Sequence, residues 1–187
     1  MLGQVIRVSE IDPNFKREVI AHEAACDIAA CFSCGTCTGG CPIHAVYPEH
    51  DPRKIVRMIN FGMKEKVLSS RYIWYCTEEC FLCEKCCPQN VKFSNVWHVL
   101  KNIAVKEGYP LPVSIDENKC SGCGICVALC PYSAMELSIQ DASKAAHLIT
   151  ISCKGCGICG GACPSGAISV NLFEDEHISA QIEALVA

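Results

Sequence analysis

Residues 31–42 read CFSCGTCTGGCP, and this pattern decides the fold: three cysteines at two-residue intervals, a fourth after three more residues, then proline. The same spacing returns as CSGCGICVALCP at residues 120–131 and as CKGCGICGGACP at residues 153–164. A further group, CTEECFLCEKCCP at residues 76–88, has one cysteine too many and one interval that is a residue longer. The chain is therefore organised around four related cysteine groups.

The cysteine content points to metal rather than to disulfides. The chain has 18 cysteines among 187 residues, which indicates either a disulfide scaffold or a metal protein. Residues 1–15 contain no apolar run of signal-peptide length, so we expect a cytoplasmic protein, where disulfides are rare. No apolar stretch approaches the roughly 18 residues that span a bilayer, so we expect no membrane insertion. The formal net charge of −4 argues against a nucleic-acid partner.

The regular groups match the run of bacterial two-cluster ferredoxins, in which three cysteines bind one 4Fe–4S cluster and the fourth ligates the other. Structural zinc usually takes cysteine pairs rather than such triplets. Glycines inside the runs let the backbone approach a cluster and turn N–H groups toward sulfur. These glycines are Gly35, Gly122, Gly124, Gly155 and Gly157. Because runs work in pairs, the sequence predicts two modules with two clusters each.

The irregular group allows three interpretations. If Pro88 follows the fourth cysteine as in the other runs, the ligands are Cys76, Cys80, Cys83 and Cys87, and we favour this frame. The alternative frame is Cys80, Cys83 and Cys86, which has regular spacing but leaves Cys87 beside its own triplet. The first three cysteines also have the spacing of radical S-adenosylmethionine enzymes, but the chain has no room for their large barrel. In the favoured frame Cys26 and Cys86 are assigned to no cluster. We expect both to be buried small apolar residues, and the alternative is that one of them serves as a substitute ligand.

Amphipathic segments are expected to surround the first two groups. Asp51 is a good N-cap and Pro52 a good first residue for a helix on which Ile55, Met58 and Ile59 lie on one face. A second helix is expected over residues 95–108, ending at Gly108, and another over residues 12–25, with Asp12 and Pro13 at its start.

The second pair of runs predicts a smaller α+β module. AMELSI (134–139), HLITIS (147–152) and AISVNLF (167–173) are expected to be short strands. The two prolines of EGYPLPVS, residues 107–114, indicate a stiff linker between the modules. Residues 173–187 have apolar positions at helical spacing, which predicts a helical tail.

The first module resembles the iron–sulfur C subunit of heterodisulfide reductase. The likeness rests on CFSCGTCTGGCP, on WYCTEECFLCEKCCPQNV at residues 74–91 and on the helix predicted after each, and it covers about residues 9–110. It implies an α-helical ferredoxin domain with two 4Fe–4S clusters, a plan shared with iron–sulfur subunits of fumarate and glycerol-3-phosphate oxidoreductases. Residues 114–172 resemble a bacterial two-cluster ferredoxin, which the simplest members of that family lack. This addition suggests a longer electron path and a different partner.

The cross-ligation rule assigns four ligands to each cluster. The four sets are Cys31, Cys34, Cys37 and Cys87 for cluster 1; Cys76, Cys80, Cys83 and Cys41 for cluster 2; Cys120, Cys123, Cys126 and Cys163 for cluster 3; and Cys153, Cys156, Cys159 and Cys130 for cluster 4. No catalytic constellation accompanies them. The six histidines are scattered, and His44, which follows a run, is expected to be structural.

The resemblance implies an electron-transfer subunit of a heterodisulfide reductase-like complex. In that family it works between the flavin-containing A subunit and the B subunit, which holds the catalytic site. The B subunit carries a Cys-Cys-Gly repeat, whereas Cys86 and Cys87 are followed by Pro88, so the chain lacks that site. Exposed clusters are sensitive to oxygen, which suggests anaerobic metabolism.

Two alternatives to this role stay open. One is a catalytic subunit whose irregular second run binds a substrate at its cluster. The other is a free soluble polyferredoxin carrier, against which the helical module and the tail argue, because both are typical of a protein that docks at a fixed place.

Overall fold

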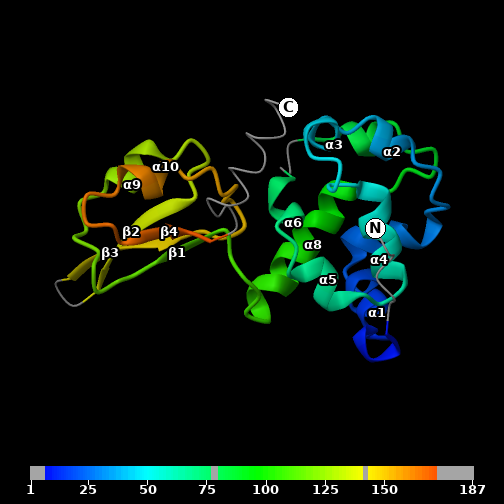
Figure 1. The fold of residues 1–187 in the computed structure, drawn as a ribbon, viewed down its shortest axis with the longest axis horizontal. Coiled ribbons are helices and arrows are strands. Elements are labelled where there is room, and N and C mark those ends of the chain that lie inside the picture. The colour runs from blue at the N-terminus through cyan, green and yellow to red at the C-terminus, as the bar shows by residue number, and fades with distance from the viewer. Residues whose placement is uncertain (1–6, 77–79, 141–142, 172–187) are drawn as a thin grey trace, which may run out of the picture. The chain divides into compact units, whose positions relative to one another are not determined.

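The computed structural model describes residues 7–76, 80–140 and 143–171 (Figure 1). The chain divides into two compact units, Met1–Tyr109 and Pro110–Ala187. The described residues combine helices with two small sheets, which confirms the expected α+β class at that level. The predicted helical tail at residues 173–187 lies outside the described residues. None of the helices in the described ranges is long and apolar enough to cross a membrane.

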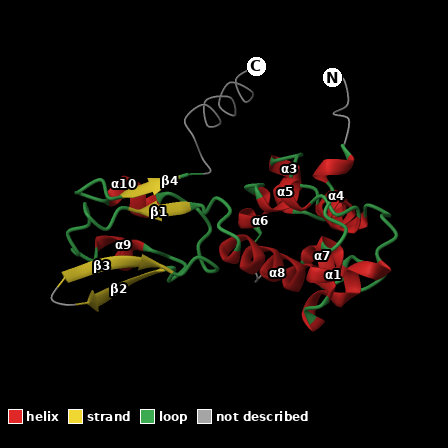
Figure 2. Ribbon diagram, turned by 90° about the horizontal axis from the view of Figure 1, so that it is seen from below, coloured by secondary structure: helices red, strands yellow, loops and turns green. Residues whose placement is uncertain are grey.

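The first unit is built from short helices around one longer helix. In chain order they are η1 (Val8–Glu10), α1 (Phe15–Ile20), η2 (Glu23–Ala30), α2 (Thr36–Gly39), α3 (Pro42–Val46), α4 (Pro52–Asn60), α5 (Lys64–Leu68), α6 (Tyr72–Tyr75), α7 (Leu82–Lys85) and α8 (Phe93–Lys106), the η segments being 3₁₀ helices. Helix α8 packs against α1, η2, α5, α6 and α7, so it is the element around which the unit is assembled (Figure 2).

Helix α4 begins as predicted. Pro52 is its first residue, and the Asp51 carboxylate accepts a hydrogen bond of 3.1 Å from the Lys54 amide, which satisfies one of the unpaired donors of the first turn. Of the predicted apolar face, Ile55 and Ile59 are buried and Met58 is partly buried. The prediction for this helix is confirmed.

Helix α8 also follows the predicted segment, although it begins two residues earlier. Its buried face includes Phe93, Trp97 and Leu100, and also the lysine Lys101. The helix ends before Gly108, whose φ of +76° ends the helical path.

Helix α1 departs from the prediction at both ends. The Asp12 carboxylate accepts a hydrogen bond of 2.8 Å from the Asn14 amide, which forms a turn before the helix rather than a cap on it. The helix starts at Phe15 and stops at Ile20, and the chain continues as the 3₁₀ segment η2. Local side-chain bonding of aspartate competes with helix formation here, so the predicted continuous helix over residues 12–25 is wrong.

Lys64 joins three helices of the first unit. Its Nζ donates to Glu18 of α1 at 2.8 Å and to Glu107, just after α8, at 2.6 Å, and it lies 5.8 Å from the centre of the Phe15 ring. The side chain is 16 % exposed, and the two carboxylates raise its pKa against the effect of burial. This cluster fixes α1 and α5 against the end of α8.

The described residues of the second unit form two antiparallel strand pairs and two short helices. Strand β1 (Val113–Ile115) pairs with β4 (Ile168–Val170), and β2 (Met135–Gln140) pairs with β3 (Ser143–Leu148). Helix α9 (Ile125–Leu129) packs on β2, helix α10 (Ile158–Ala162) packs on β4, and the two helices contact each other. Each cysteine run of this unit thus supplies one short helix that packs on one of the two strand pairs, as an internal repeat (Figure 1).

Two strand predictions needed correction. The third strand lies at residues 143–148, four residues before the predicted HLITIS segment, because Met135 pairs with Leu148 in the register of the hairpin. Strand β1 lies at the end of the segment predicted to be a linker, where Val113 pairs with Val170. A strand this short has no alternating pattern of its own, and only its partner reveals it.

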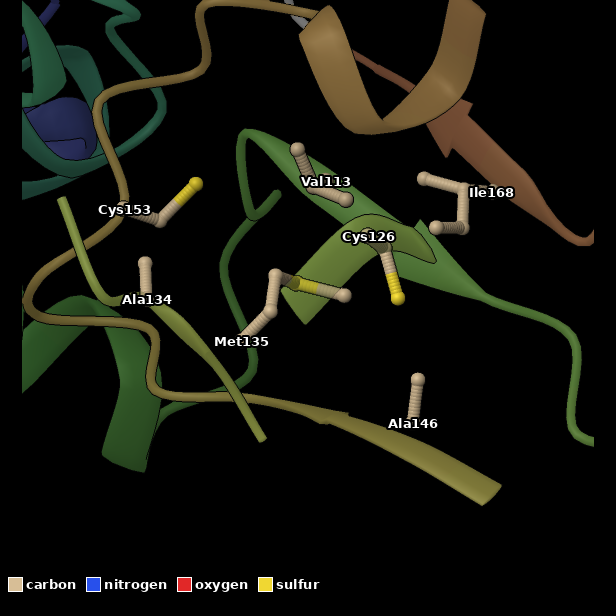
Figure 3. Packing of buried hydrophobic residues seen from close by; sticks show 7 residues of the cluster. All are labelled: Val113, Cys126, Ala134, Met135, Ala146, Cys153 and Ile168. Carbon is tan, nitrogen blue, oxygen red and sulfur yellow. The ribbon is translucent and has the colours of Figure 1, made fainter. Parts of the chain in front are cut away.

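Cysteine side chains form part of the core of the second unit. Its buried cluster consists of Val113, Cys126, Ala134, Met135, Ala146, Cys153 and Ile168 (Figure 3). Cys126 lies between the strand pair that carries Val113 and Ile168 and the pair that carries Met135 and Ala146. The apolar contribution from other residues is small, as expected for so short a module.

Candidate iron–sulfur sites

Cysteines from two different runs meet at one small cavity in the first unit. The cavity is lined by Cys31, Cys34 and Cys37 of the first run and by Cys87 of the second. The side-chain contact with Thr36, at 3.3 Å, lowers the pKa of Cys34, whereas burial raises the pKa of Cys37 to about 11. The structure brings together the four cysteines that the sequence groups as cluster 1.

A second group of cysteines lies around Cys83 in the same unit. Cys83 is 5 % exposed, and its pKa is raised first by burial and then by the nearby charges of Cys76, Cys41 and Cys80. Cys41 and Cys76 are also buried. Residues 77–79, which contain the extra residue of this run, lie outside the described residues. The neighbours of Cys83 are the cysteines expected for cluster 2.

The position of α7 sets the frame of the irregular run. In each run a short helix carries the third cysteine as its second residue: Cys37 in α2, Cys83 in α7, Cys126 in α9 and Cys159 in α10. In every run the fourth cysteine follows the third by four residues, so Cys87 corresponds to Cys41, Cys130 and Cys163 of the other runs. This common frame favours Cys76, Cys80, Cys83 and Cys87 over the frame that uses Cys86.

Cys86 is the residue just after α7, and its Sγ lies 3.4 Å from the Cys83 carbonyl oxygen and 3.5 Å from that of Thr36. It is partly exposed, so the prediction of a buried residue is wrong. Burial raises its pKa, and the charges on Cys87, Cys34 and Cys41 add to this. The side chain of Cys26 lies outside the described residues.

Left-handed residues recur at fixed places in the regular runs. Residues two and four positions after the first cysteine have positive φ: Ser33 (59°) and Gly35 (87°), Gly122 (65°) and Gly124 (77°), Gly155 (66°) and Gly157 (80°). Such alternation curls a loop so that successive N–H groups point inward, where they can bind a negative group. The glycines were expected from the sequence, but Ser33 was missed because serine gives no signal for this conformation.

A second repeated turn follows the fourth cysteine of three runs. The residue three positions later has positive φ, namely Asn90 (54°), Ser133 (49°) and Gly166 (61°). In two of these turns the next amide points at the thiol, with Val91 N 3.4 Å from Cys87 Sγ and Ala134 N 3.3 Å from Cys130 Sγ. Hydrogen bonds to ligand sulfur are one determinant of cluster reduction potential. This turn was not expected from the sequence.

The chain after Cys41, the fourth cysteine of the first run, does not form this turn, because Pro42 begins helix α3 directly after it. Cys41 is the N-terminal cap residue of α3, and its backbone is extended. His44, in the same helix, contacts the His50 carbonyl oxygen through Nδ1 at 3.0 Å. The fourth ligand position of the first run therefore has a different surrounding from the other three.

The second unit repeats the arrangement of the first. One cavity is lined by Cys120, Cys123 and Cys126 together with Cys163 of the other run. Burial raises the pKa of Cys153, and charges on Cys159, Cys130 and Cys156 add to it. The amide of Gly155 lies 3.4 Å from Cys153 Sγ. These are the two sets of four cysteines expected for clusters 3 and 4.

The donor set fits iron–sulfur clusters. A cubane takes one thiolate at each of its four iron corners, and each of the two cavities is lined by four cysteines. Grouped cysteines with amides aimed at sulfur are the surroundings that such a cluster requires.

Comparison with protein families identifies the class of the chain. Residues 30–92 match a family model described as a 4Fe–4S dicluster domain, and residues 113–170 match a second model with the same description. The chain is therefore an iron–sulfur protein with two 4Fe–4S dicluster domains. Each matched segment contains two of the four cysteine runs.

The chain is related to the iron–sulfur C subunits of heterodisulfide reductases, which confirms the resemblance noted in the sequence. It is 38 % identical over 111 residues to the CoB–CoM heterodisulfide reductase iron–sulfur C subunit (the second of its kind) of Methanocaldococcus jannaschii, covering 56 % of the chain and 58 % of that protein. The C subunit of the H₂:CoB–CoM heterodisulfide,ferredoxin reductase of Methanothermobacter marburgensis is 36 % identical over 108 residues, 58 % of the chain and 57 % of that protein. The CoB–CoM heterodisulfide reductase iron–sulfur C subunit of Methanopyrus kandleri is 34 % identical over 112 residues, 56 % of the chain and 57 % of that protein. The chain thus spans somewhat over half the length of these relatives.

Proposed function

We propose that the chain is the electron-transfer iron–sulfur subunit of a heterodisulfide reductase-like complex. Four 4Fe–4S clusters, each able to accept and release one electron, would supply the redox chemistry. The relatives named as iron–sulfur C subunits and the two dicluster domains support this role. The chain's own residues hold the clusters, orient N–H groups toward their sulfurs and limit access of water.

The observation that carries the proposal is that cysteines from two different runs meet at one site. Cys87 lines the cavity of the Cys31 run, and Cys163 lines the cavity of the Cys120 run. A run that gives its fourth cysteine to the neighbouring cluster keeps two clusters close together within each unit, which favours transfer between them. We therefore propose the four ligand sets as Cys31, Cys34, Cys37 and Cys87; Cys76, Cys80, Cys83 and Cys41; Cys120, Cys123, Cys126 and Cys163; and Cys153, Cys156, Cys159 and Cys130.

The proposed partners follow from the relatives. Their names place them in heterodisulfide reductases, so we propose a flavin-containing partner that resembles the A subunit of such enzymes and a catalytic partner that resembles the B subunit. With four oxidised clusters the net charge of the chain becomes about −12, because each cluster with four thiolates carries about −2. Electropositive partner surfaces would suit such a protein.

Iron analysis tests the cluster content. Anaerobically purified protein is expected to hold about 16 iron and 16 acid-labile sulfide per chain, with EPR signals of reduced cubanes after dithionite treatment. Well under 16 iron, or zinc in place of iron, would contradict four clusters.

Co-purification tests the proposed complex. The tagged chain, co-expressed anaerobically with candidate flavin-containing and Cys-Cys-Gly-containing proteins, is expected to retain both, and reduced flavin should then reduce the clusters. A cluster-loaded chain that remains alone and exchanges electrons freely in solution would instead indicate a polyferredoxin carrier.

A further inference from the structure

An apolar groove of about 570 Å³ lies over helices α4 and α5 of the first unit, which pack against each other (Figure 2). The buried side chains of Ile55, Met63 and Val67 form its floor. Met58 is partly exposed, and Phe61, the residue at which α4 ends, is 53 % exposed. Aromatic rings and methionines are enriched at protein interfaces, and methionine adapts its shape to what it contacts.

The exposed rim of the groove favours a protein segment over a small molecule as the occupant. A pocket for a small molecule buries most of the ligand surface. Here Phe61 and the charged side chains of Lys54, Arg57 and Lys66 stand in solvent at the edge. A groove over neighbouring helices, with an apolar floor, suits an amphipathic helix that lays residues i, i+3, i+4 and i+7 into it.

The rim carries positive charge that is available to a ligand. Arg57 lies over the Phe61 ring, with its Cζ 5.4 Å from the ring centre, and Lys66 is exposed on α5. Among the described residues, no carboxylate pairs with Arg57 or with Lys66. Lys54 also lines the groove, but it lies 3.7 Å from the Asp51 carboxylate, which offsets its charge. Arg57 and Lys66 are therefore the cations that an occupant would meet.

One carboxylate, that of Glu49, lies at the Tyr72 end of the groove. It accepts a hydrogen bond of 2.9 Å from the Tyr72 hydroxyl. Three cations against one carboxylate leave the groove basic, although the formal net charge of the chain is −4. A basic site on an otherwise acidic protein attracts a carboxylate-bearing segment to one place and fixes its register, because the remaining surface repels that segment.

The groove adjoins helices that lead to both cysteine groups of the first unit. Helix α4 is capped by Asp51, whose carboxylate accepts a hydrogen bond of 2.6 Å from Thr38, the residue after Cys37. Tyr72 begins α6, and α6 ends at Cys76. A partner held in the groove thus contacts elements that position ligands of both groups.

We propose that this groove binds an acidic amphipathic helix of a partner subunit, with the apolar side chains of that helix in the groove and its carboxylates paired with Arg57 and Lys66. This inference rests on the proposed electron-transfer complex and deepens it, since it assigns a docking surface to the chain and a chemical class to the segment that binds there.

The first test measures the affinity of the cluster-loaded full chain for the co-purifying flavin-containing and Cys-Cys-Gly-containing proteins, anaerobically and over a range of salt. The double variant Arg57→Gln, Lys66→Gln removes the two rim charges, and Phe61→Ser removes the exposed ring. The matched controls are Lys106→Gln and Val105→Ser, which remove an exposed lysine and an exposed apolar side chain near the end of α8.

The double variant is expected to bind one partner about threefold or more weakly and to show less dependence on salt, because two ion pairs are lost. Phe61→Ser is expected to weaken binding about tenfold and to keep the salt dependence, because it removes apolar contact alone. Both controls should behave as the wild type. Wild-type affinity and salt dependence in the double variant and in Phe61→Ser, at full iron content, would overturn the inference.

The second test identifies the occupant directly. The photo-crosslinking amino acid p-benzoylphenylalanine is placed at Phe61 in the co-expressed complex, and the captured peptide is sequenced by mass spectrometry. An acidic partner segment with apolar residues at helical spacing is expected. Capture of a second copy of the chain, of its own residues 173–187 or of a partner segment without carboxylates would overturn the inference. A wild-type chain that binds neither partner would instead reject the proposed function.

Discussion

Cys86 faces Gly40, and a β-carbon added to Gly40 would stand 3.2 Å from the Cys86 Sγ. The two residues hold the same place in their runs, directly before the fourth cysteine and directly after a short helix, α7 or α2. In the other two runs the residue directly before the fourth cysteine is Leu129 or Ala162, neither of which carries a thiol. Cys86 therefore lies against the first run, at the position that directly precedes the fourth cysteine of its own run.

Replacement of cysteines in the irregular run should separate the two frames. Cys76→Ser is expected to lower the iron content from about 16 to about 12 per chain or to change the EPR signal of one cluster, because a ligand is lost. Cys86→Ser, a matched change three residues beyond Cys83, is expected to keep the full iron content. The opposite pattern would show that Cys80, Cys83 and Cys86 form the triplet.

Gly122→Ala should damage cluster 3. Gly122 has φ of +65°, and a β-carbon there would lie 2.5 Å from the Lys144 carbonyl oxygen of β3, so both the backbone and the packing oppose alanine. We expect a loss of about 2 kcal/mol or more in stability, with about four fewer iron per chain, measured by thermal unfolding and iron analysis.

Gly161→Ala is the control for this change. Gly161 lies in α10 and has open space around the position of a β-carbon, so alanine should be neutral or slightly stabilising. Equal behaviour of the two variants would argue against a tight approach of β3 to the Gly122 loop.

Asp51→Ala should weaken the first unit. The carboxylate is 2 % exposed, accepts a 2.6 Å hydrogen bond from Thr38 Oγ1 and caps α4 through the Lys54 amide, so it links the α2 segment to α4. Loss of a cap and of a buried acceptor is expected to cost about 1–3 kcal/mol, measured by urea unfolding. Lys54→Ala removes only a 61 % exposed ion-pair partner and should change stability by less than about 0.5 kcal/mol. A larger effect of Lys54→Ala than of Asp51→Ala would contradict this account.

His50 should make stability fall in mild acid. The imidazole is fully buried against Trp97, with ring centres 5.6 Å apart, and burial lowers its pKa from 6.5 to about 4. Between these values the unfolded chain binds a proton that the folded chain does not, so stability is present above pH 6.5 and is lost as the pH falls toward 4. The loss is about 1.4 kcal/mol for each pH unit.

His50→Phe should remove this part of the pH dependence. Thermal unfolding of the cluster-loaded chain at about pH 7 and about pH 5.5, on either side of the ordinary histidine pKa, is the measurement. The variant should lose less stability between the two values than the wild type. His22→Phe is the control, because His22 is exposed and should leave the difference unchanged. An unaltered difference in His50→Phe would show that the ring does not stay neutral in the folded protein.

The sequence predicted the elements that depend on local signals. Asp51 with Pro52 marked the start of α4, and Gly108 marked the end of α8, because caps and breakers act within one turn. The cysteine spacing predicted which thiols gather, since a run on a tight loop has few ways to bind a cubane. The sequence predicted that Gly35 lets the backbone approach a cluster, because glycine is the residue that most readily adopts a positive φ.

The missed features depend on distant parts of the chain. Strand β1 exists because Val113 meets Val170, far along the chain, and the position of β3 follows from its register with β2. Ser33 and Asn90 adopt left-handed conformations that neighbouring contacts must support. The partial exposure of Cys86 and the burial of Lys101 result from the meeting of α7 and α8 with elements far away in sequence, which no local pattern records.

In the second unit, the described hydrophobic cluster holds Cys126 and Cys153 together with five other buried residues, so thiols that we propose as metal ligands also pack the interior. Without clusters this unit has little to oppose unfolding, and proteases act on the unfolded chain. The amount of this protein in a cell should therefore follow the supply of iron and sulfide through the lifetime of the polypeptide, even at a constant rate of synthesis.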